Sequence, residues 1–167
     1  MEITQNDLKE AQELAKLQKK IDNIDAEYVD LISDEIFQRQ PFYMTVLLGY
    51  RMDTTPEEME EIMRIFFLVW EYFRHNKKVQ VKKVTEANFE AIQRKHIEML
   101  QSADREPREL EKRKIYSSSL EDLHSKAIFA AVLFRYNHKP VLLQMDDIRK
   151  GIILAGIISF IKCFETI

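Results

Sequence analysis

The chain has 167 residues, of which 46% are hydrophobic and 32% charged, and its formal net charge is -3. These values are ordinary for a globular domain and exclude wholesale disorder. The acidic balance provides no global attraction to nucleic acid or to an anionic membrane. Three glycines and four prolines are too few for the tight turns of an all-β protein of this length, so the composition favours helices.

The cysteine content and the first residues favour a cytoplasmic protein. Cys163 is the single cysteine and has no partner for an intramolecular disulfide. The start of the chain is acidic and polar, unlike a secretory signal. The longest uncharged apolar run, residues 151–161, is too short to cross a hydrocarbon layer about 30 Å thick. We therefore expect no membrane insertion and interpret this run as a core helix.

Six apolar residues in the first segment follow one another at alternating spacings of three and four, which is the seam of a heptad pattern. The seam consists of Leu14, Leu17, Ile21, Ile24, Tyr28 and Leu31. It predicts one long helix, or two nearly collinear helices, over about residues 6–37. Packing of the seam against its own domain is one interpretation, and self-association through the same six residues is the other.

The clearest local signal is the start of a helix at "TTPEEMEEI". Thr55 and Glu58 have the spacing of a capping box, and Pro56 stands at the first helical position, where its missing N–H costs nothing. The following "IFFLVWEYF" is apolar nearly all round, which is typical of a helix with neighbours on several sides. We expect residues 56–76 to form the central helix.

Weaker signals mark the other elements. A short apolar helix is expected at "FYMTVLLGY", residues 42–50. Residues 79–84 are expected to be an extended link or a short strand, followed by a helix from Thr85 to about Ser102. Residues 104–119 are expected to be a polar mobile connection, in which a helical turn after Pro107 is an alternative. A further helix is expected to start at Ser119, and a last helix to run from Asp146 to about Phe164.

The chain contains the spelling Phe-Arg-x-Asn-x-Lys twice, at 73–78 and at 134–139. A shift of 61 residues superimposes the two copies and also places Thr85 on Asp146. This predicts an internal duplication of a helical hairpin, residues 55–103 and 119–165. Convergent helix capping is the alternative explanation for the repeated spelling.

Asparagine is the usual substitute for glycine where a helix ends in a left-handed residue. We therefore expect Asn76 and Asn137 to end their helices in that conformation. Phe73 and Phe134 are then expected to be the last core residues of the two helices.

The basic residues of the motif are Arg74, Lys78, Arg135 and Lys139. In the favoured interpretation they place positive charge beside the carbonyl groups at helix C-termini. In the functional alternative the two basic corners converge on an anion or a partner, because arginine binds phosphate and carboxylate through two hydrogen bonds.

Three other features suggest chemistry but have simpler explanations. Residues 74–83 carry five Lys or Arg and no acid, as a phosphate-binding segment would, but no aromatic side chain is interleaved to stack on bases. Glu121 and His124 form one E-x-x-H pair, whereas carboxylate-bridged metal centres need a second pair. Cys163 lies in an apolar segment, where a thiol stays protonated and inert.

We therefore expect an all-α single domain over residues 1–167, a bundle of five to seven helices in which an N-terminal helix or helix pair at 1–40 accompanies the two hairpins. The expected function is a non-catalytic module that binds a protein partner or forms a homo-oligomer. Nucleic-acid or anion binding through residues 74–83 is the alternative, and a metal-dependent enzyme ranks below both. No cofactor, catalytic residue or metal ligand is assigned.

Overall fold

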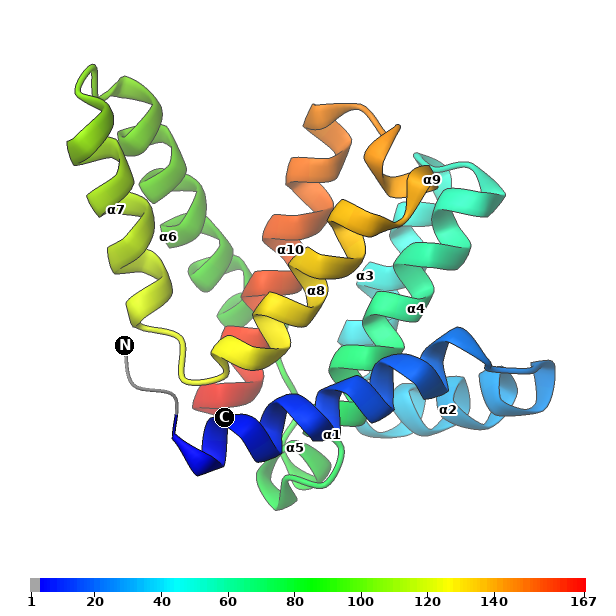
Figure 1. Cartoon of the computed structure of the whole chain (residues 1–167). Coiled ribbons are helices and arrows are strands. Elements are labelled where there is room, and N and C mark those ends of the chain that lie inside the picture. Colours follow the sequence, from blue (N-terminus) through cyan, green and yellow to red (C-terminus); the bar gives the residue numbers. More distant parts are fainter. Residues whose placement is uncertain (1–3) are drawn as a thin grey trace.

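The computed structural model describes residues 4–167, without the side chains of Tyr116 and Ser119. This part of the chain forms ten α-helices and one 3₁₀ helix, and it contains no strand (Figure 1). The helices are α1 (Gln5–Asp22), α2 (Ala26–Arg39), α3 (Pro41–Gly49), η1 (Tyr50–Met52), α4 (Pro56–Phe73), α5 (Lys77–Val81), α6 (Glu86–Arg105), α7 (Glu109–Glu121), α8 (Lys126–His138), α9 (Pro140–Leu143) and α10 (Asp147–Thr166). The all-α prediction is confirmed, but the predicted number of five to seven helices is too low.

The additional helices lie where links were expected. Residues 79–84 were expected to be extended, but α5 includes three of them. The polar stretch 104–119 was expected to be a mobile connection, yet most of it belongs to α7, which packs along α6. Pairs such as Lys114 with Glu111, 3.0 Å apart, support its exposed face. Tertiary packing thus outweighs the polar composition.

The predicted helix start at Ser119 is wrong, because that residue lies within α7 and α8 begins at Lys126. The N-cap of α8, Ser125, makes no capping bond with its own side chain. Its backbone N–H instead donates to Oε1 of Glu165, 2.5 Å away near the end of α10. A distant carboxylate therefore replaces the local capping signal that the sequence was expected to provide.

The centre of the core is α4, as predicted. It begins with the expected capping box, in which the backbone N–H of Glu58 donates to Thr55 Oγ1 and the backbone N–H of Thr55 donates to Glu58 Oε2. Every residue from Ile65 to Trp70 has a fully buried side chain. Helices α1, α3, α8, α9 and α10 all contact α4, which explains why this segment is apolar nearly all round.

Aromatic side chains join α3, α4 and α10 within this core. The Tyr43 ring stacks on Phe66 with centroids 4.7 Å apart, and it meets the edge of Phe160 at the same distance. The Tyr43 hydroxyl donates to the carbonyl oxygen of Phe66 over 2.8 Å, so this buried polar group is satisfied. Trp70 packs against Phe164 on the last helix.

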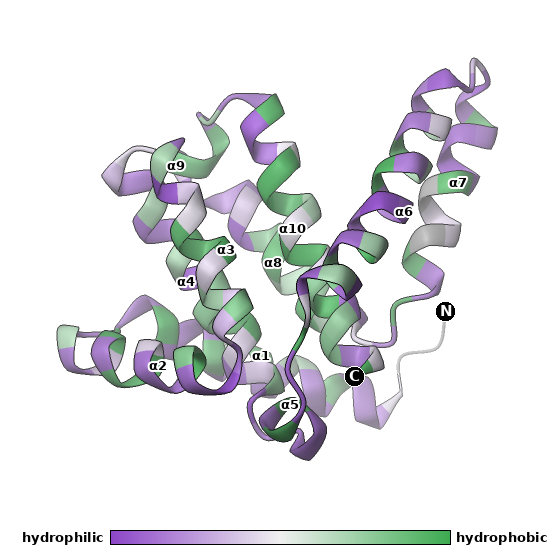
Figure 2. Cartoon of the chain, turned by 180° about the vertical axis from the view of Figure 1, so that it is seen from behind, coloured by the Kyte–Doolittle hydropathy of each residue, from purple (hydrophilic) through white to green (hydrophobic). Residues whose placement is uncertain are grey.

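Helices α6 and α7 form a hairpin that leans away from the rest of the molecule (Figure 1), while α6 also packs along α10. The two arms of this hairpin are more hydrophilic than α8 and α10 (Figure 2). On α10, Gly156 lies so close to the Tyr50 hydroxyl that a Cβ would overlap it, whereas the position of Gly151 is open. A close approach that only a glycine permits thus occurs at Gly156.

The N-terminal segment forms two helices that are not collinear. Helix α1 ends at Asp22, and Asp25 caps α2 by accepting the backbone N–H of Tyr28. The chain turns back between them, so α2 runs in roughly the opposite direction to α1 (Figure 1). The heptad spacing of the apolar residues continues across this turn, although no single helix spans it.

The two copies of the repeated motif occupy different structural positions. Phe73 ends α4 and is buried, whereas Phe134 lies one turn before the end of α8 and is 56% exposed. Asn76 is the extended N-cap of α5, and Asn137 lies inside α8. No non-glycine residue of the described chain has a positive φ, so both capping predictions and the buried anchor at Phe134 are wrong.

A pattern of long, short and long helix does occur twice, as α4–α5–α6 and as α8–α9–α10. The predicted caps Thr85 and Asp146 begin the last helix of each set. The differing positions of the motif within these sets leave the internal duplication unconfirmed.

Candidate functional site

A groove of about 710 Å³ runs between α1 and α8 and is open to solvent. Alanines make up much of its lining, with two on α1 and three on α8: Ala11, Ala15, Ala127, Ala130 and Ala131. Because alanine extends only one carbon from the backbone, both helix surfaces are low here. The groove exists because residues on facing helices are small and no third helix covers them.

An exposed aromatic pair stands at the α8 side of this groove. The Phe134 ring stacks on the His138 imidazole one turn later, with centroids 3.9 Å apart and planes 18° from parallel. His138 Nδ1 lies 2.8 Å from the carbonyl oxygen of Phe134, so this nitrogen carries the proton when the ring is neutral. The stacking and the hydrogen bond hold a large apolar side chain in a fixed place at the surface.

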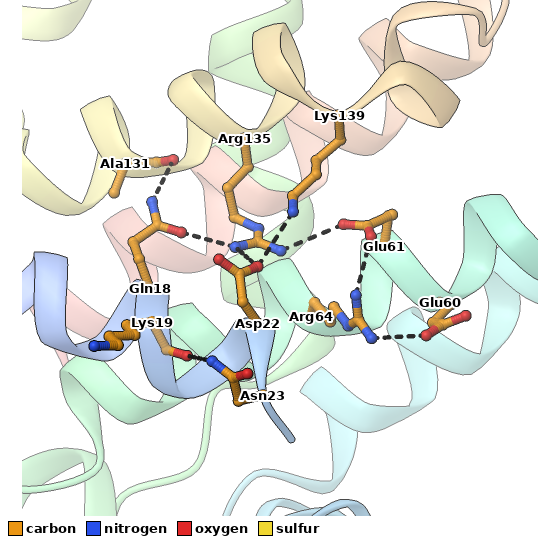
Figure 3. A network of polar contacts seen from close by, with 10 residues as sticks. All are labelled: Gln18, Lys19, Asp22, Asn23, Glu60, Glu61, Arg64, Ala131, Arg135 and Lys139. Carbon is orange, nitrogen blue, oxygen red and sulfur yellow. Dashed lines mark hydrogen bonds and ion pairs between the residues drawn. The ribbon is translucent and has the colours of Figure 1, made fainter. Parts of the chain in front are cut away.

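The end of the groove beside the C-terminal part of α8 contains a polar network around Arg135 (Figure 3). Only 2% of the Arg135 side chain is exposed. Its Nη1 donates to Gln18 Oε1 at 2.9 Å and to Asp22 Oδ1 at 3.0 Å, both on α1. Its Nη2 donates to Glu61 Oε2 on α4 at 3.3 Å. The guanidinium therefore fixes the positions of three helices relative to one another.

The network is completed by side chains on both walls. Gln18 donates through Nε2 to the carbonyl oxygen of Ala131, 3.2 Å away. Lys139 Nζ donates to the same oxygen of Asp22 that Arg135 binds, at 3.2 Å. Burial by itself would raise the pKa of Asp22, but the hydrogen bonds and charges of Arg135 and Lys139 outweigh it and lower the pKa. Asp22 is thus held as a carboxylate.

Positive charge exceeds negative charge at this end of the groove. Arg135 and Lys139 share Asp22, and Glu61 is also bound by Arg64 at 3.2 Å. Lys19 lines the same end, and within residues 4–167 its ammonium group forms no ion pair. The groove therefore combines an apolar floor with a basic end, which suits a ligand that is apolar along one face and carries a carboxylate.

The other predicted basic corner lies elsewhere and is already occupied. Arg74 donates to Glu35 on α2, with Nη2 2.5 Å from Oε2, and to Glu71 at 3.3 Å. Lys78 is exposed on α5. Glu61, the α4 partner of Arg135, precedes Arg74 by 13 residues, about 20 Å of helix. The structure does not bring the two corners together around one anion.

A second polar network surrounds the nearly buried Glu71. Its Oε1 accepts from Lys20 Nζ at 2.9 Å and from the Tyr28 hydroxyl at 2.7 Å. Burial by itself would raise the pKa of Glu71, but the bonds from Lys20 and Tyr28 and the charges of Lys20 and Arg74 lower it. This network joins α1 and α2 to α4.

The six seam residues are mostly covered by the chain itself. Leu14 and Ile21 belong to the core, and Leu17, Ile24 and Tyr28 pack against it. Leu31 alone among the six is exposed, at 65%. Most of the seam therefore packs within the chain, Leu31 is open to solvent, and Leu14 also lines the groove between α1 and α8.

The structure places the residues with possible metal or redox chemistry apart. Glu121 ends α7, whereas His124 lies in the following turn, so the pair does not share a helix face. Among the described residues, no group of three or more His, Cys, Asp or Glu side chains could hold a metal ion. Cys163 is buried, and burial raises the pKa of its thiol to about 12.

Arg135 and Lys139, two of the four motif residues named from the sequence, line the groove, but the alanines beside them were not singled out. The pattern was visible, since Ala11 and Ala15 are four residues apart and would share one face of a helix. Nothing in the sequence distinguishes such a face from one covered by the chain's own side chains. Only the crossing of α1 and α8 shows that the alanines of both helices line one groove.

Comparison of the whole chain with protein-family models, with curated proteins and with solved structures finds no match. Over the described residues, no helix combines the length and hydropathy needed to span a membrane.

Proposed function

We propose that this protein is a non-catalytic interaction module that receives an amphipathic helix of a protein partner in the groove between α1 and α8. One observation carries the proposal: an alanine-floored groove has an exposed aromatic pair on one wall and a surplus of positive charge at one end. Amphipathic helices commonly bind in grooves of this kind through apolar residues spaced by three or four.

The small residues of the groove floor allow close packing. Two packed helices lie 8–10 Å apart depending on the side chains at the contact. The floor alanines come from both helices, for example Ala15 from α1 and Ala130 from α8. They therefore allow a ligand helix to approach α1 and α8 at an axis-to-axis distance of about 8 Å. A ligand helix can therefore place its larger apolar side chains on the floor without displacing α1 or α8.

Phe134 supplies the large apolar contact that the floor lacks. Aromatic residues contribute a large share of the binding energy at protein interfaces. Its stacking on His138 holds the ring in place before binding, so less conformational entropy is lost when the partner docks. Phe134 is therefore the residue expected to contribute most to affinity.

The charge at the polar end defines the partner further. Lys19 has no ion-pair partner in the described chain, and Lys139 shares Asp22 with Arg135. An aspartate or glutamate near one end of the partner helix would complete this arrangement. Such rim charges contribute more to orientation and association rate than to affinity.

Selection from a displayed library of amphipathic peptides of about 20 residues, long enough to form an isolated helix, tests the proposal. Wild-type protein is the target, and the Ala130→Trp variant, in which the groove is filled, is used for counter-selection. We expect enriched peptides with an acidic residue at one end, and we expect their amide shift perturbations on the protein to map to α1 and α8. Affinity should fall at least about tenfold in Phe134→Ala, the range of an interface hot spot.

Phe37→Ala is the matched control, because Phe37 is also an exposed aromatic, at 63%, but lies on α2 outside the groove lining. It should bind the selected peptides like the wild type. Circular dichroism must show that each variant keeps its helices. Failure to enrich any helix, or equal binding to Ala130→Trp, would contradict the proposal. A wild-type dimer that Ala130→Trp converts to a monomer would instead identify a second copy as the occupant.

A further inference from the structure

A second surface, separate from the groove, is defined by four lysines at the two ends of α5: Lys77, Lys78, Lys82 and Lys83, here called the lysine cluster. All four are exposed. Across residues 4–167 none of them forms an ion pair, and residues 74–85 contain no acid. Arg74, in contrast, is neutralised by Glu35 and Glu71. The unneutralised charge of this segment is therefore carried by the lysine cluster.

A buried glutamine fixes the backbone that carries the lysine cluster. Gln40 is 1% exposed, and its Nε2 donates to the carbonyl oxygens of Val79 and Lys82, both at 2.7 Å. Its Oε1 accepts the backbone N–H of Val84 at 2.9 Å. The Gln40 side chain thus holds the backbone at Val79, Lys82 and Val84. The lysines consequently extend from a rigid support rather than from a loose loop.

We propose that the lysine cluster binds the phosphate backbone of duplex nucleic acid without regard to base sequence. The four lysines lie within seven consecutive residues, 77–83, at the start of α5 and just after its end. Their ammonium groups are point charges that bind phosphate oxygens without reading the bases. A regular phosphate backbone therefore complements the charge of this segment.

The side chains around the lysine cluster favour duplex nucleic acid over a single strand and over an anionic membrane. Proteins that bind single strands use aromatic side chains on which bases stack, and residues 74–85 contain none. Helices that lie on a membrane insert an apolar face. Helix α5 has five residues, and its Val79 points into the core, so Val81 is its one exposed large apolar residue. A duplex backbone therefore fits the segment better than a single strand or an anionic membrane.

Fluorescence anisotropy of a labelled mixed-sequence DNA duplex tests this proposal on the full chain. Four phosphate contacts predict an affinity loss of about 150-fold between about 50 and 200 mM salt, since each contact lowers the logarithm of affinity by about 0.9 for every tenfold rise in salt. A Lys77→Glu/Lys78→Glu variant should weaken binding at low salt. Its remaining salt dependence should be about 12-fold over the same range, as expected for two contacts.

The matched control is Lys9→Glu/Lys16→Glu, which changes the net charge equally at two exposed lysines of α1. It should bind more tightly than the α5 variant and keep the wild-type salt dependence. The proposal is overturned if wild type shows no binding up to about 0.1 mM protein at low salt, the weak limit of non-specific binding. Equal losses in both variants, or vesicles of anionic lipid that bind through the lysine cluster when the duplex does not, would also overturn it.

Discussion

Arg74 and Arg135 occupy the same position in the repeated motif, and each fastens a different helix of the N-terminal pair to the core. Arg74 binds Glu35 on α2, and Arg135 binds Asp22 on α1. The N-terminal helices are thus held by two guanidinium groups that come from α8 and from the end of α4. Their different exposure, 26% for Arg74 and 2% for Arg135, predicts different contributions to stability.

Replacement of Arg135 with alanine should lower the free energy of unfolding by roughly 3 kcal/mol, the lower end for breaking a buried ion pair. The change removes the donor from Gln18 Oε1 and from Glu61 Oε2, while Glu61 Oε1 keeps its bond from Arg64. Arg74→Ala should cost less, because solvent already screens that pair. Urea denaturation of both variants measures the difference. A smaller loss in Arg135→Ala than in Arg74→Ala would show that the buried network does not hold α8 in place.

The lowered pKa of Glu71 predicts a loss of stability in acid. Above its ordinary value of 4.5, Glu71 is ionised in both the folded and the unfolded chain, and its stabilising contribution is complete. As the pH falls below 4.5, the unfolded chain takes up the proton first, so the free energy of unfolding decreases until the pH is below the lowered folded pKa. Glu71→Gln should flatten this part of a curve of urea midpoint against pH. A variant curve as steep as that of the wild type would assign the acid sensitivity to other carboxylates.

The two glycines of α10 should respond to alanine with opposite signs. Gly151→Ala meets no neighbouring atom and should stabilise the protein by about 0.5–1 kcal/mol through helix propensity. Gly156→Ala forces the Tyr50 hydroxyl away and should destabilise by about 1–2 kcal/mol. In a Tyr50→Phe background the overlap is removed, so Gly156→Ala should become neutral or stabilising. Thermal unfolding of the four variants measures this, and equal effects at both glycines would refute the close contact.

Gln40→Met keeps the volume of the side chain but removes its three hydrogen bonds to residues 79–84. Each buried group left without a partner costs about 1–3 kcal/mol, so the loss of all three bonds should cost at least about 3 kcal/mol. Hydrogen exchange of the Val84 amide should accelerate more than that of amides within α4. Uniform acceleration throughout the chain would show a loss of global stability without local release of this segment.

Trp70→Ala should cost roughly 3–5 kcal/mol, the range for truncation of a large core aromatic. The indole is fully buried, packs against Phe164, and donates from Nε1 to Glu35 Oε1 at 3.2 Å. Chemical denaturation monitored by circular dichroism gives the value. An unchanged midpoint would remove Trp70 from the core.

The sequence was sufficient to predict the elements whose signals are local. The capping box at Thr55, the all-round apolar run after it and the caps at Thr85 and Asp146 all depend on residues within one or two turns of each other. Each of these starts is found where expected. The central place of α4 was likewise predictable, because a helix apolar on every side must be surrounded.

The features that could not be predicted depend on residues distant in the sequence. Helix α8 takes its cap from Glu165, 40 positions away from Ser125. Asn76 caps the start of α5 rather than the end of α4, since Gln40 holds the following segment close to α2. The Arg135 network joins residues 74 to 117 positions apart. No local pattern contains information about such partners.

The capping of α8 by Glu165 also has a consequence for the order of folding during synthesis. Helix α8 forms one wall of the groove, yet the carboxylate that accepts the backbone N–H groups of His124 and Ser125, just before α8 begins, belongs to the last turn of α10. While a ribosome is still adding α9 and α10, the start of α8 lacks this cap and also the aromatic side chains of α10 that complete the core. The wall of the groove is therefore completed late, so a nascent chain that ends before α10 should not yet form a finished groove.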